Sequence, residues 1–218
     1  MPSNGPRTNV AERVVSETDA ALETPLTRLA DRALFFRKFL SKGRIISSAV
    51  PSSRALVQGM LRPVDFSRPA TIVELGAGIG PVTEEVLARL EPHHRFVAVE
   101  NDPEFCEVLR RRFPNLWLLE CDATRAGAQL AAQGVHRVDY VLSGLPTPSL
   151  PRRAAVRLCR WLRRALAPNG LFIQITVAPL VFRAFYDRLF EQVQYRMVWQ
   201  NVPPGGVYVC SQPRVGHT

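Results

Sequence analysis

Short apolar segments alternate with amphipathic segments along this chain from Thr71 onward. The apolar runs have the length of buried strands, and the segments between them place apolar residues at helical spacing. Strands that alternate with helices form a parallel sheet covered on both faces. We therefore predict an α/β fold, with strands at 71–75, 95–100, 116–120, 137–143, 170–177, 193–201 and 206–211 and helices at 81–90, 103–112, 124–133, 151–166 and 180–190.

The last two predicted strands are joined differently from the others. Their connection, Pro203-Pro204-Gly205-Gly206, is too short to hold a crossover helix. These two strands must therefore pair antiparallel, as a hairpin at the end of the chain.

A separate amphipathic segment precedes the alternating region. Leu29, Ala33, Phe36 and Leu40 form one helical stripe, widened by two further phenylalanines. Six basic residues and one acid lie between residues 28 and 44. Such a helix either lies in the headgroup layer of an anionic membrane or packs over the pocket of the next domain, or does both. The residues assigned to membrane contact are Phe35, Phe36, Arg37, Lys38, Phe39 and Lys42.

Length and composition divide the chain into three parts. Residues 1–27, rich in Pro, Ser, Thr and Asn, are predicted to form a flexible tail. Residues 28–46 form the basic amphipathic helix, and residues 47–218 form one domain. The hydrophobic content of 46% is enough for a buried core.

The charge and the cysteines limit the partners. A net charge of +9 predicts an anionic partner, and both nucleic acid and an acidic membrane surface fit. The arginines of 152–164 form either a solvated helix face or a phosphate-binding one. The four cysteines are scattered, which indicates neither a metal site nor a disulfide framework and suits a reducing cytosol. We expect neither export nor a membrane span, because no apolar run approaches the ~20 residues that a span needs.

The most informative stretch is Val73-Glu74-Leu75-Gly76-Ala77-Gly78-Ile79-Gly80-Pro81. Its three alternating glycines fill the turn between the first predicted strand and the first helix. Glycine accepts positive φ and lets a ligand approach the backbone closely. The helix beyond presents free N–H groups, and Pro81 suits its first position. The pattern G-x-G-x-G departs from the dinucleotide fingerprint, whose third glycine comes one residue later.

An acid follows each of the next two predicted strands. Glu100 is placed to accept the hydroxyls of a ribose, and Asp122 to meet an adenine amino group. A glycine turn and two acids at three successive strand ends resemble the S-adenosylmethionine site of class I methyltransferases. The alternative is a tight turn with two solvated acids. The predicted cofactor site consists of Glu74, Gly76, Ala77, Gly78, Gly80, Glu100, Asn101, Asp122, Ala123 and Ser143.

The loop after the fourth predicted strand is the expected acceptor site. Methyltransferases that act on the amino groups of adenine or cytosine carry Asn or Asp, then Pro, then an aromatic residue here. This chain has Ser143-Gly144-Leu145-Pro146, followed by Thr147 and Pro148. Without an aromatic side chain to stack on a base, a non-aromatic amine is favoured. The Ser143 hydroxyl and the Gly144 carbonyl are the candidates for orienting that amine.

Four segments together resemble the bacterial phospholipid N-methyltransferases, a family that is itself similar to the rRNA adenine dimethylases. They are Val50-Pro51-Ser52-Ser53-Arg54, Val73-Glu74-Leu75-Gly76, Ser143-Gly144-Leu145-Pro146 and Trp199-Gln200-Asn201-Val202-Pro203-Pro204. The resemblance implies a Rossmann-like seven-stranded sheet. It also implies stepwise methylation of phosphatidylethanolamine toward phosphatidylcholine by a monomer on the cytosolic leaflet. Ala77 is a departure, because some relatives carry proline there.

Several roles have an alternative. Ser52 and Ser53 hold either the cofactor's polar end or a lipid phosphate, or they cap a helix at 54–61. Arg54 is a candidate phosphate partner. Glu74, inside an apolar strand, is a candidate for the methionine amino group. The competing functions are an rRNA or other nucleic-acid methyltransferase, weakened by the Ser143 motif, and a non-catalytic scaffold that binds the cofactor, weakened by the intact glycines and acids.

Overall fold

The computed structural model describes residues 53–176, 182–201 and 204–214. The predicted tail, the basic amphipathic helix with its membrane-contact residues, and Ser52 lie outside this range. Within the described ranges, no helix combines the length and apolarity that crossing a bilayer requires. The structure therefore bears on the α/β domain alone.

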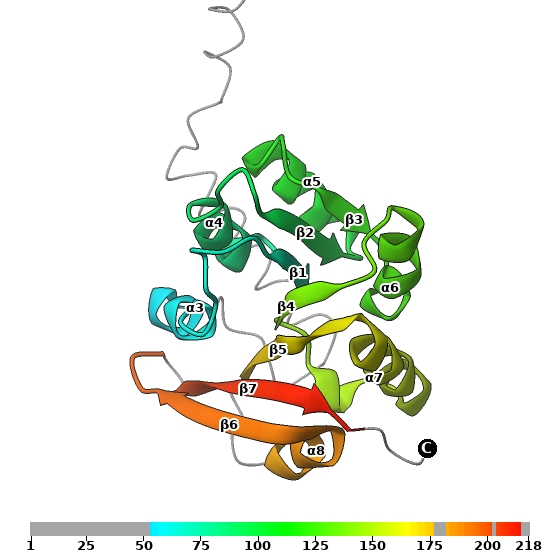
Figure 1. The fold of residues 1–218 in the computed structure, drawn as a ribbon. Coiled ribbons are helices and arrows are strands. Elements are labelled where there is room, and N and C mark those ends of the chain that lie inside the picture. Colours follow the sequence, from blue (N-terminus) through cyan, green and yellow to red (C-terminus); the bar gives the residue numbers. More distant parts are fainter. Residues whose placement is uncertain (1–52, 177–181, 202–203, 215–218) are drawn as a thin grey trace, which may run out of the picture.

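The domain is a seven-stranded sheet with helices on both faces, as the alternation predicted (Figure 1). The strands are β1 (Thr71–Leu75), β2 (Arg95–Glu100), β3 (Leu118–Glu120), β4 (Val138–Ser143), β5 (Leu166–Thr176), β6 (Phe190–Val198) and β7 (Gly205–Pro213). The helices are α3 (Arg54–Leu61), α4 (Pro81–Leu87), α5 (Pro103–Arg112), α6 (Ala123–Ala132), α7 (Arg152–Ala165) and α8 (Arg183–Leu189), with a 3₁₀ turn at Thr147–Ser149.

The strand order is β3-β2-β1-β4-β5-β7-β6. Neighbours among β1 to β5 run parallel, and β7 pairs antiparallel with both β5 and β6. The predicted C-terminal hairpin is confirmed. Leu75, near the centre of the sheet, pairs with Val99 on one side and Ser143 on the other. The carboxyl ends of β1, β2 and β4 are therefore level, which brings the loops that follow them together.

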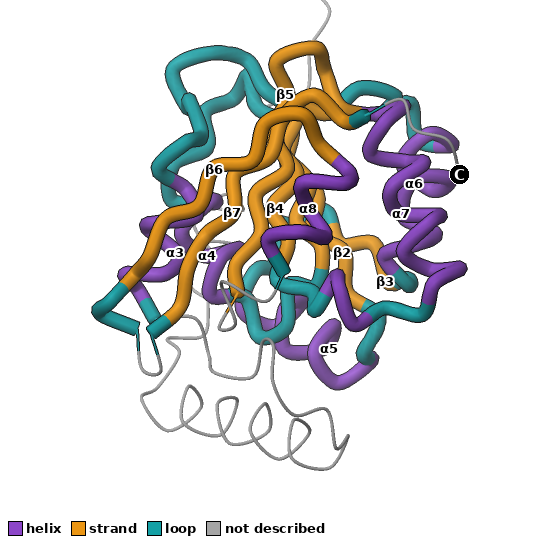
Figure 2. The backbone as a smooth tube through the Cα atoms, turned by 90° about the horizontal axis from the view of Figure 1, so that it is seen from below, coloured by secondary structure: helices purple, strands orange, loops and turns teal. Residues whose placement is uncertain are grey.

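Alternate residues of each strand face opposite layers of the core, as the pleat requires. In β1, Val73 and Leu75 pack against the layer of α6, α7 and α8, while Ile72 packs against the layer of α3, α4 and α5 (Figures 1 and 2). Both layers are closely packed. A Cβ on Gly127 of α6 would lie 2.1 Å from the Trp161 ring of α7.

The predicted boundaries differ from the observed ones mainly at β5 and β6. β6 begins at Phe190, three residues earlier than predicted, because the Phe190 ring stacks on Phe172 at a centroid distance of 5.6 Å. β5 begins at Leu166, so the preceding helix ends at Ala165. On α7, Leu158 and Leu162 are buried and most of the arginines are exposed, which fits both a solvated face and a phosphate-binding face.

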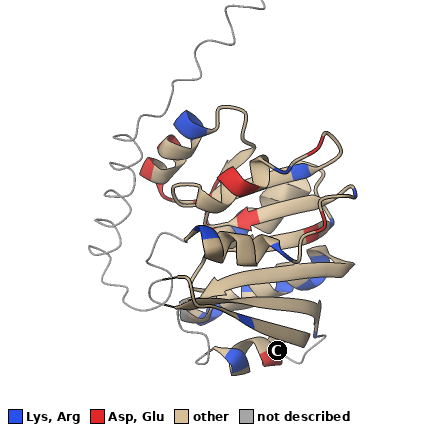
Figure 3. Ribbon diagram, turned by 90° about the vertical axis from the view of Figure 1, so that its left-hand side faces the viewer, with Lys and Arg blue, Asp and Glu red and all other residues tan. Residues whose placement is uncertain are grey.

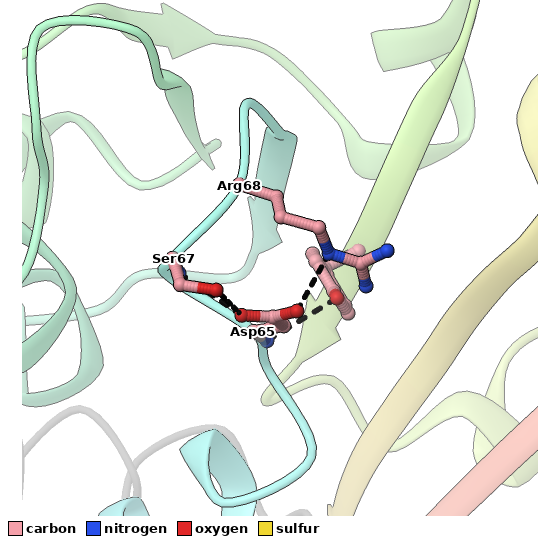
Figure 4. Close-up of polar contacts among 4 residues, drawn as sticks. Asp65, Ser67 and Arg68 are labelled. Carbon is pink, nitrogen blue, oxygen red and sulfur yellow. Dashed lines mark hydrogen bonds and ion pairs between the residues drawn. The ribbon is translucent and has the colours of Figure 1, made fainter.

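A polar cluster fixes the loop between α3 and β1 (Figure 4). The Asp65 carboxylate accepts from the Ser67 hydroxyl at 2.6 Å, from the Ser67 N–H at 3.0 Å and from Arg68 Nε at 2.6 Å. The Asp65 N–H donates to the Tyr140 hydroxyl on β4 at 3.2 Å. The hydrogen bonds from Ser67, followed by Arg68, lower the pKa of Asp65 to about 2. This cluster joins the end of α3 to the amino edge of the sheet, so α3 begins at the carboxyl edge.

Candidate functional site

The three glycines of the turn after β1 adopt the left-handed conformation. Their φ angles are 75° at Gly76, 59° at Gly78 and 84° at Gly80. The N–H groups of Gly76 and Ala77 donate to the Val99 carbonyl on β2, at 2.8 and 3.2 Å. Residues with a side chain seldom adopt this conformation. The turn therefore needs glycine at these positions for its backbone path alone.

Gly76 is also a close-approach position. A Cβ there would lie 2.6 Å from Leu145 Cδ2, in the loop that follows β4. The same loop donates from the Gly144 N–H to the Leu75 carbonyl at 3.0 Å. The predicted acceptor loop thus packs directly on the glycine turn. A ligand on this turn would lie beside an acceptor held at the next strand end.

The Glu100 carboxylate organises the glycine turn. It is only 7% exposed, and it accepts three backbone N–H groups. Oε2 accepts from Gly78 at 2.8 Å, and Oε1 accepts from Asn101 and Asp102 at 2.8 and 2.9 Å. A carboxylate has about four acceptor positions, so Oε2 retains room for one more donor, such as a ribose hydroxyl.

Glu74 brings a second buried carboxyl group to the same place. It is 3% exposed, and its Oε2 accepts from the Thr83 hydroxyl of α4 at 2.6 Å. Burial raises the pKa of Glu74 to about 7, against the lowering effect of the Thr83 hydrogen bond and with a further rise from the Glu100 charge. Two buried carboxyl groups close together favour a cationic ligand, because a positive charge offsets both the desolvation and the mutual repulsion.

Asp122 is the N-cap of α6. Its Oδ1 accepts from the Thr124 N–H at 2.7 Å, at the start of α6. Its side chain is exposed, and Oδ2 has no hydrogen bond to any described residue. The capping bond holds Asp122 and Ala123 at the strand end next to Glu100. The predicted contact with an adenine amino group stays a prediction for Oδ2.

A buried glutamine fixes the acceptor loop. Gln174 of β5 is 1% exposed, and all of its hydrogen-bonding groups are used. Its Nε2 donates to the carbonyls of Leu145 and Ile175, each at 2.8 Å, and its Oε1 accepts from the Thr147 hydroxyl at 2.7 Å. Sequence reasoning missed this residue, although a lone amide inside the apolar run 171–176 was a signal.

The two groups predicted to orient the amine keep unused hydrogen-bonding capacity, and Ser143 itself is fully buried. Ser143 Oγ accepts from the Leu145 N–H at 3.3 Å, which leaves its own hydrogen and a lone pair. The Gly144 carbonyl accepts from no described residue. Both groups belong to the loop that packs on the glycine turn.

Ser53 and Arg54 take no part in the hydrogen bonds around the glycine turn. Ser53 Oγ accepts from the Leu56 N–H at 3.2 Å and caps α3, as the structural alternative predicted. The Ser53 N–H donates to the buried Asn201 side chain, beyond β6, at 3.3 Å. Arg54 is exposed at the start of α3. The structure therefore joins Ser53 to the hairpin turn and shows no hydrogen bond from Ser53 or Arg54 to the glycine turn.

Comparison with known proteins is consistent with this geometry. A family model described as "Methyltransferase domain" matches residues 72–170. The chain is 38% identical over 185 residues to the ornithine lipid N-methyltransferase of Singulisphaera acidiphila, covering 84% of this chain and 96% of that protein. It is 31% identical over 125 residues to the ribosomal RNA small subunit methyltransferase A of a Synechococcus strain, covering 52% of this chain and 43% of that protein.

Solved structures show the same fold at low sequence identity. Human methyltransferase-like protein 13, in complex with SAH, has a TM-score of 0.55 and 20% identity, covering 75% of this chain and 81% of its own. The 1,6-didemethyltoxoflavin-N1-methyltransferase of Burkholderia thailandensis, with bound S-adenosylhomocysteine, has a TM-score of 0.53 and 18% identity, covering 89% and 94%. The predicted fold class is confirmed, and S-adenosylmethionine is the cofactor.

The close approach at Gly76 gives the first testable prediction. Gly76→Ala should weaken S-adenosylmethionine binding by about tenfold or more, because the Cβ displaces Leu145 in addition to straining the backbone. Gly134→Ala is the matched control, since Gly134 has a φ of 79° with nothing within 4 Å of the added Cβ. Isothermal titration calorimetry measures both. Equal affinities in the two variants would contradict a cofactor site at the close-approach position Gly76.

The raised pKa of Glu74 gives the second testable prediction. Near pH 7 this carboxyl is about half protonated, and a cation bound beside it should release roughly half a proton. Calorimetry in two buffers of different ionisation enthalpy measures the protons released on binding S-adenosylmethionine. Because the Glu74→Gln side chain cannot ionise, proton release by this variant measures the protons that come from every other group, including the cofactor's amine. Identical proton release in the wild type and the variant would remove Glu74 from the site.

Proposed function

We propose that this chain methylates an aliphatic amine in a membrane-lipid headgroup. The chain belongs to the S-adenosylmethionine-dependent methyltransferase family that includes the ornithine lipid N-methyltransferase of Singulisphaera acidiphila, and the proposal starts from that membership. The observation that carries the proposal is the acceptor loop. Ser143 and Gly144 offer two oxygen acceptors against the glycine turn, and Thr147 and Pro148 follow where a base-stacking aromatic would stand. An aliphatic amine needs the acceptors and no stacking platform.

The chemistry asks little of the protein beyond placement. Bound S-adenosylmethionine supplies an electrophilic methyl group on a positively charged sulfur. In our proposal the Ser143 hydroxyl and the Gly144 carbonyl accept N–H bonds from the neutral amine and direct its lone pair at that methyl. The new N–C bond forms as the S–C bond breaks, and the resulting ammonium then gives a proton to water. Holding the two reactants in line accounts for most of the rate in such a reaction.

Two lipid amines are candidates. The amine of ornithine lipid is supported by the 38% identical relative, which the chain covers almost end to end. Phosphatidylethanolamine is supported by the resemblance of the Ser-Gly-Leu-Pro and Asn-x-Pro-Pro segments to phospholipid N-methyltransferases. Both lipids combine a primary amine with an anionic group, which is the kind of group that the exposed Arg54 guanidinium pairs with. We favour ornithine lipid.

The cellular setting is part of the proposal. The basic amphipathic helix at 28–46 would dock a monomeric enzyme on the cytosolic face of an anionic membrane. The same helix would be close enough along the chain to cover the cofactor. Nucleic acid is the weaker alternative, since the match to the ribosomal RNA enzyme covers 43% of that protein.

Thin-layer separation tests the substrate. The full chain is incubated with methyl-labelled S-adenosylmethionine and, in separate reactions, ornithine lipid, phosphatidylethanolamine and ribosomal RNA. We expect label in ornithine lipid, and Ser143→Ala should lower kcat/KM for the lipid by about tenfold through loss of one amine acceptor. Label in phosphatidylethanolamine alone would select the second candidate. Label in RNA but in neither lipid would overturn the proposal.

A further inference from the structure

The turn between β6 and β7 carries an exposed tryptophan. Trp199 follows β6 directly and its side chain is 71% exposed, more than any other large hydrophobic residue in the described part of the chain. A single exposed apolar residue is common on protein surfaces. Its meaning therefore depends on where it lies and on what surrounds it.

Trp199 lies at the edge of the sheet that holds the site. Met197 of β6 pairs with Gly206, and Gly206 pairs with Thr176, the last residue of β5. The acceptor loop leaves the same edge, because Ser143 pairs with Gln174. The turn lies beside the start of α3, where the Asn201–Ser53 hydrogen bond holds it (Figures 1 and 2).

The neighbourhood of the turn is apolar and basic. An open groove of about 800 Å³ runs between α3 and β6. Arg62 and Arg196, both exposed, line it together with Arg89, Gln58 and Gln200, and Leu61, Val64, Phe66, Met197, Val198 and Val207 form its largely buried floor. Arg54 is exposed two turns before Arg62 on α3, which carries no acid. Apolar surface edged by arginines is the composition that the headgroup level of a membrane favours.

The C-terminal half of the described domain carries a net positive charge. Residues 123–214 contain twelve arginines and three acids, Asp139, Asp187 and Glu191. Most of the acidic positions lie instead around β1, β2 and β3 (Figure 3). Six of these arginines are on α7, in the helix layer on the other face of the sheet from α3, so this charge attracts the domain to an anionic surface at long range, and Arg54, Arg62 and Arg196 are the arginines near α3 and β6.

We propose that Trp199, which follows β6, and the adjoining face of α3 form a docking surface for an anionic phospholipid bilayer, with the Trp199 ring inserted at headgroup level. This inference rests on the proposed lipid substrate and adds the surface that meets the membrane. It makes the acceptor loop face the bilayer, so that a lipid amine reaches Ser143 without leaving the membrane. RNA fits the surface less well, because strand binding relies on successive stacking aromatics, and the described part of this surface offers only Trp199 and the partly buried Phe66 of the groove.

Quenching by brominated lipids tests the insertion. The full chain is mixed with vesicles of phosphatidylglycerol and phosphatidylcholine whose acyl chains carry bromine, and tryptophan emission is recorded. We expect quenching in the wild type, and equal quenching in Trp117→Phe and Trp161→Phe. Trp199→Phe should lose it while still sedimenting with vesicles. Undiminished quenching in Trp199→Phe would overturn the proposal, and so would emission that responds to RNA but not to vesicles.

A second variant gives the strength of the contact. Trp199→Ala forfeits burial of part of a large ring, so its partition onto these vesicles should weaken by about tenfold. Unchanged partition would overturn the proposal and leave docking to residues 1–42, which a deletion of that segment then measures. Since Trp199 is exposed, unfolding midpoints should match the wild type and exclude misfolding.

Methylation activity in detergent micelles separates a failure of the proposed function from a failure of the proposed docking surface. Methylation of lipid dispersed in neutral micelles needs no bilayer docking, so Trp199→Ala should equal the wild type there and fall by about tenfold on vesicles at low lipid concentration. Absence of methylation by the wild type in micelles would contradict the proposed function, whatever the quenching shows. Equal activity of the variant on vesicles would contradict the docking surface alone.

Discussion

The hydrogen bonds of the Glu100 carboxylate fix the geometry of the carboxyl edge of the sheet. The carboxylate ties the Gly78 N–H of one strand end to the Asn101 and Asp102 N–H groups of the next. Charge-assisted bonds of this kind are roughly twice as strong as neutral ones, and here they are shielded from water. Fixing the three glycines in the left-handed conformation costs backbone conformational entropy, and these hydrogen bonds offset that cost. Glu74 adds a second buried carboxyl beside it, so the turn favours a cation.

The glycine turn and the loop after β4, the predicted acceptor loop, form one packed unit. Leu145 lies against Gly76, the Gly144 N–H bonds to the end of β1, and Gln174 holds the Leu145 carbonyl from β5. Satisfying every polar group of Gln174 makes this loop rigid, because a buried amide left unpaired would be expensive. A rigid loop suits a reaction whose rate depends on placement.

Sequence periodicity was enough to predict the sheet, the hairpin and the glycine turn, because each depends on short-range patterns. It was not enough for contacts between distant segments. Gln174 was missed since its partners lie 27 and 29 residues away and become neighbours only when β4 pairs with β5. For Ser53 the local hydrogen bond with the Leu56 N–H supports the cap, but the bond from the Ser53 N–H to Asn201, 148 residues away, could not be predicted. The start of β6 was misplaced because the stacking of Phe190 on Phe172 is invisible in one strand's pattern.

A crystal structure of the full chain with S-adenosylhomocysteine tests the central claim most directly. We predict a ribose hydroxyl within hydrogen-bonding distance of Glu100 while the Gly78–Glu100 bond is kept, with the ligand's amino group near Glu74 and its sulfur facing Ser143. A ligand bound away from the glycine turn, or a Glu100 side chain rotated away from the ribose, would contradict the account.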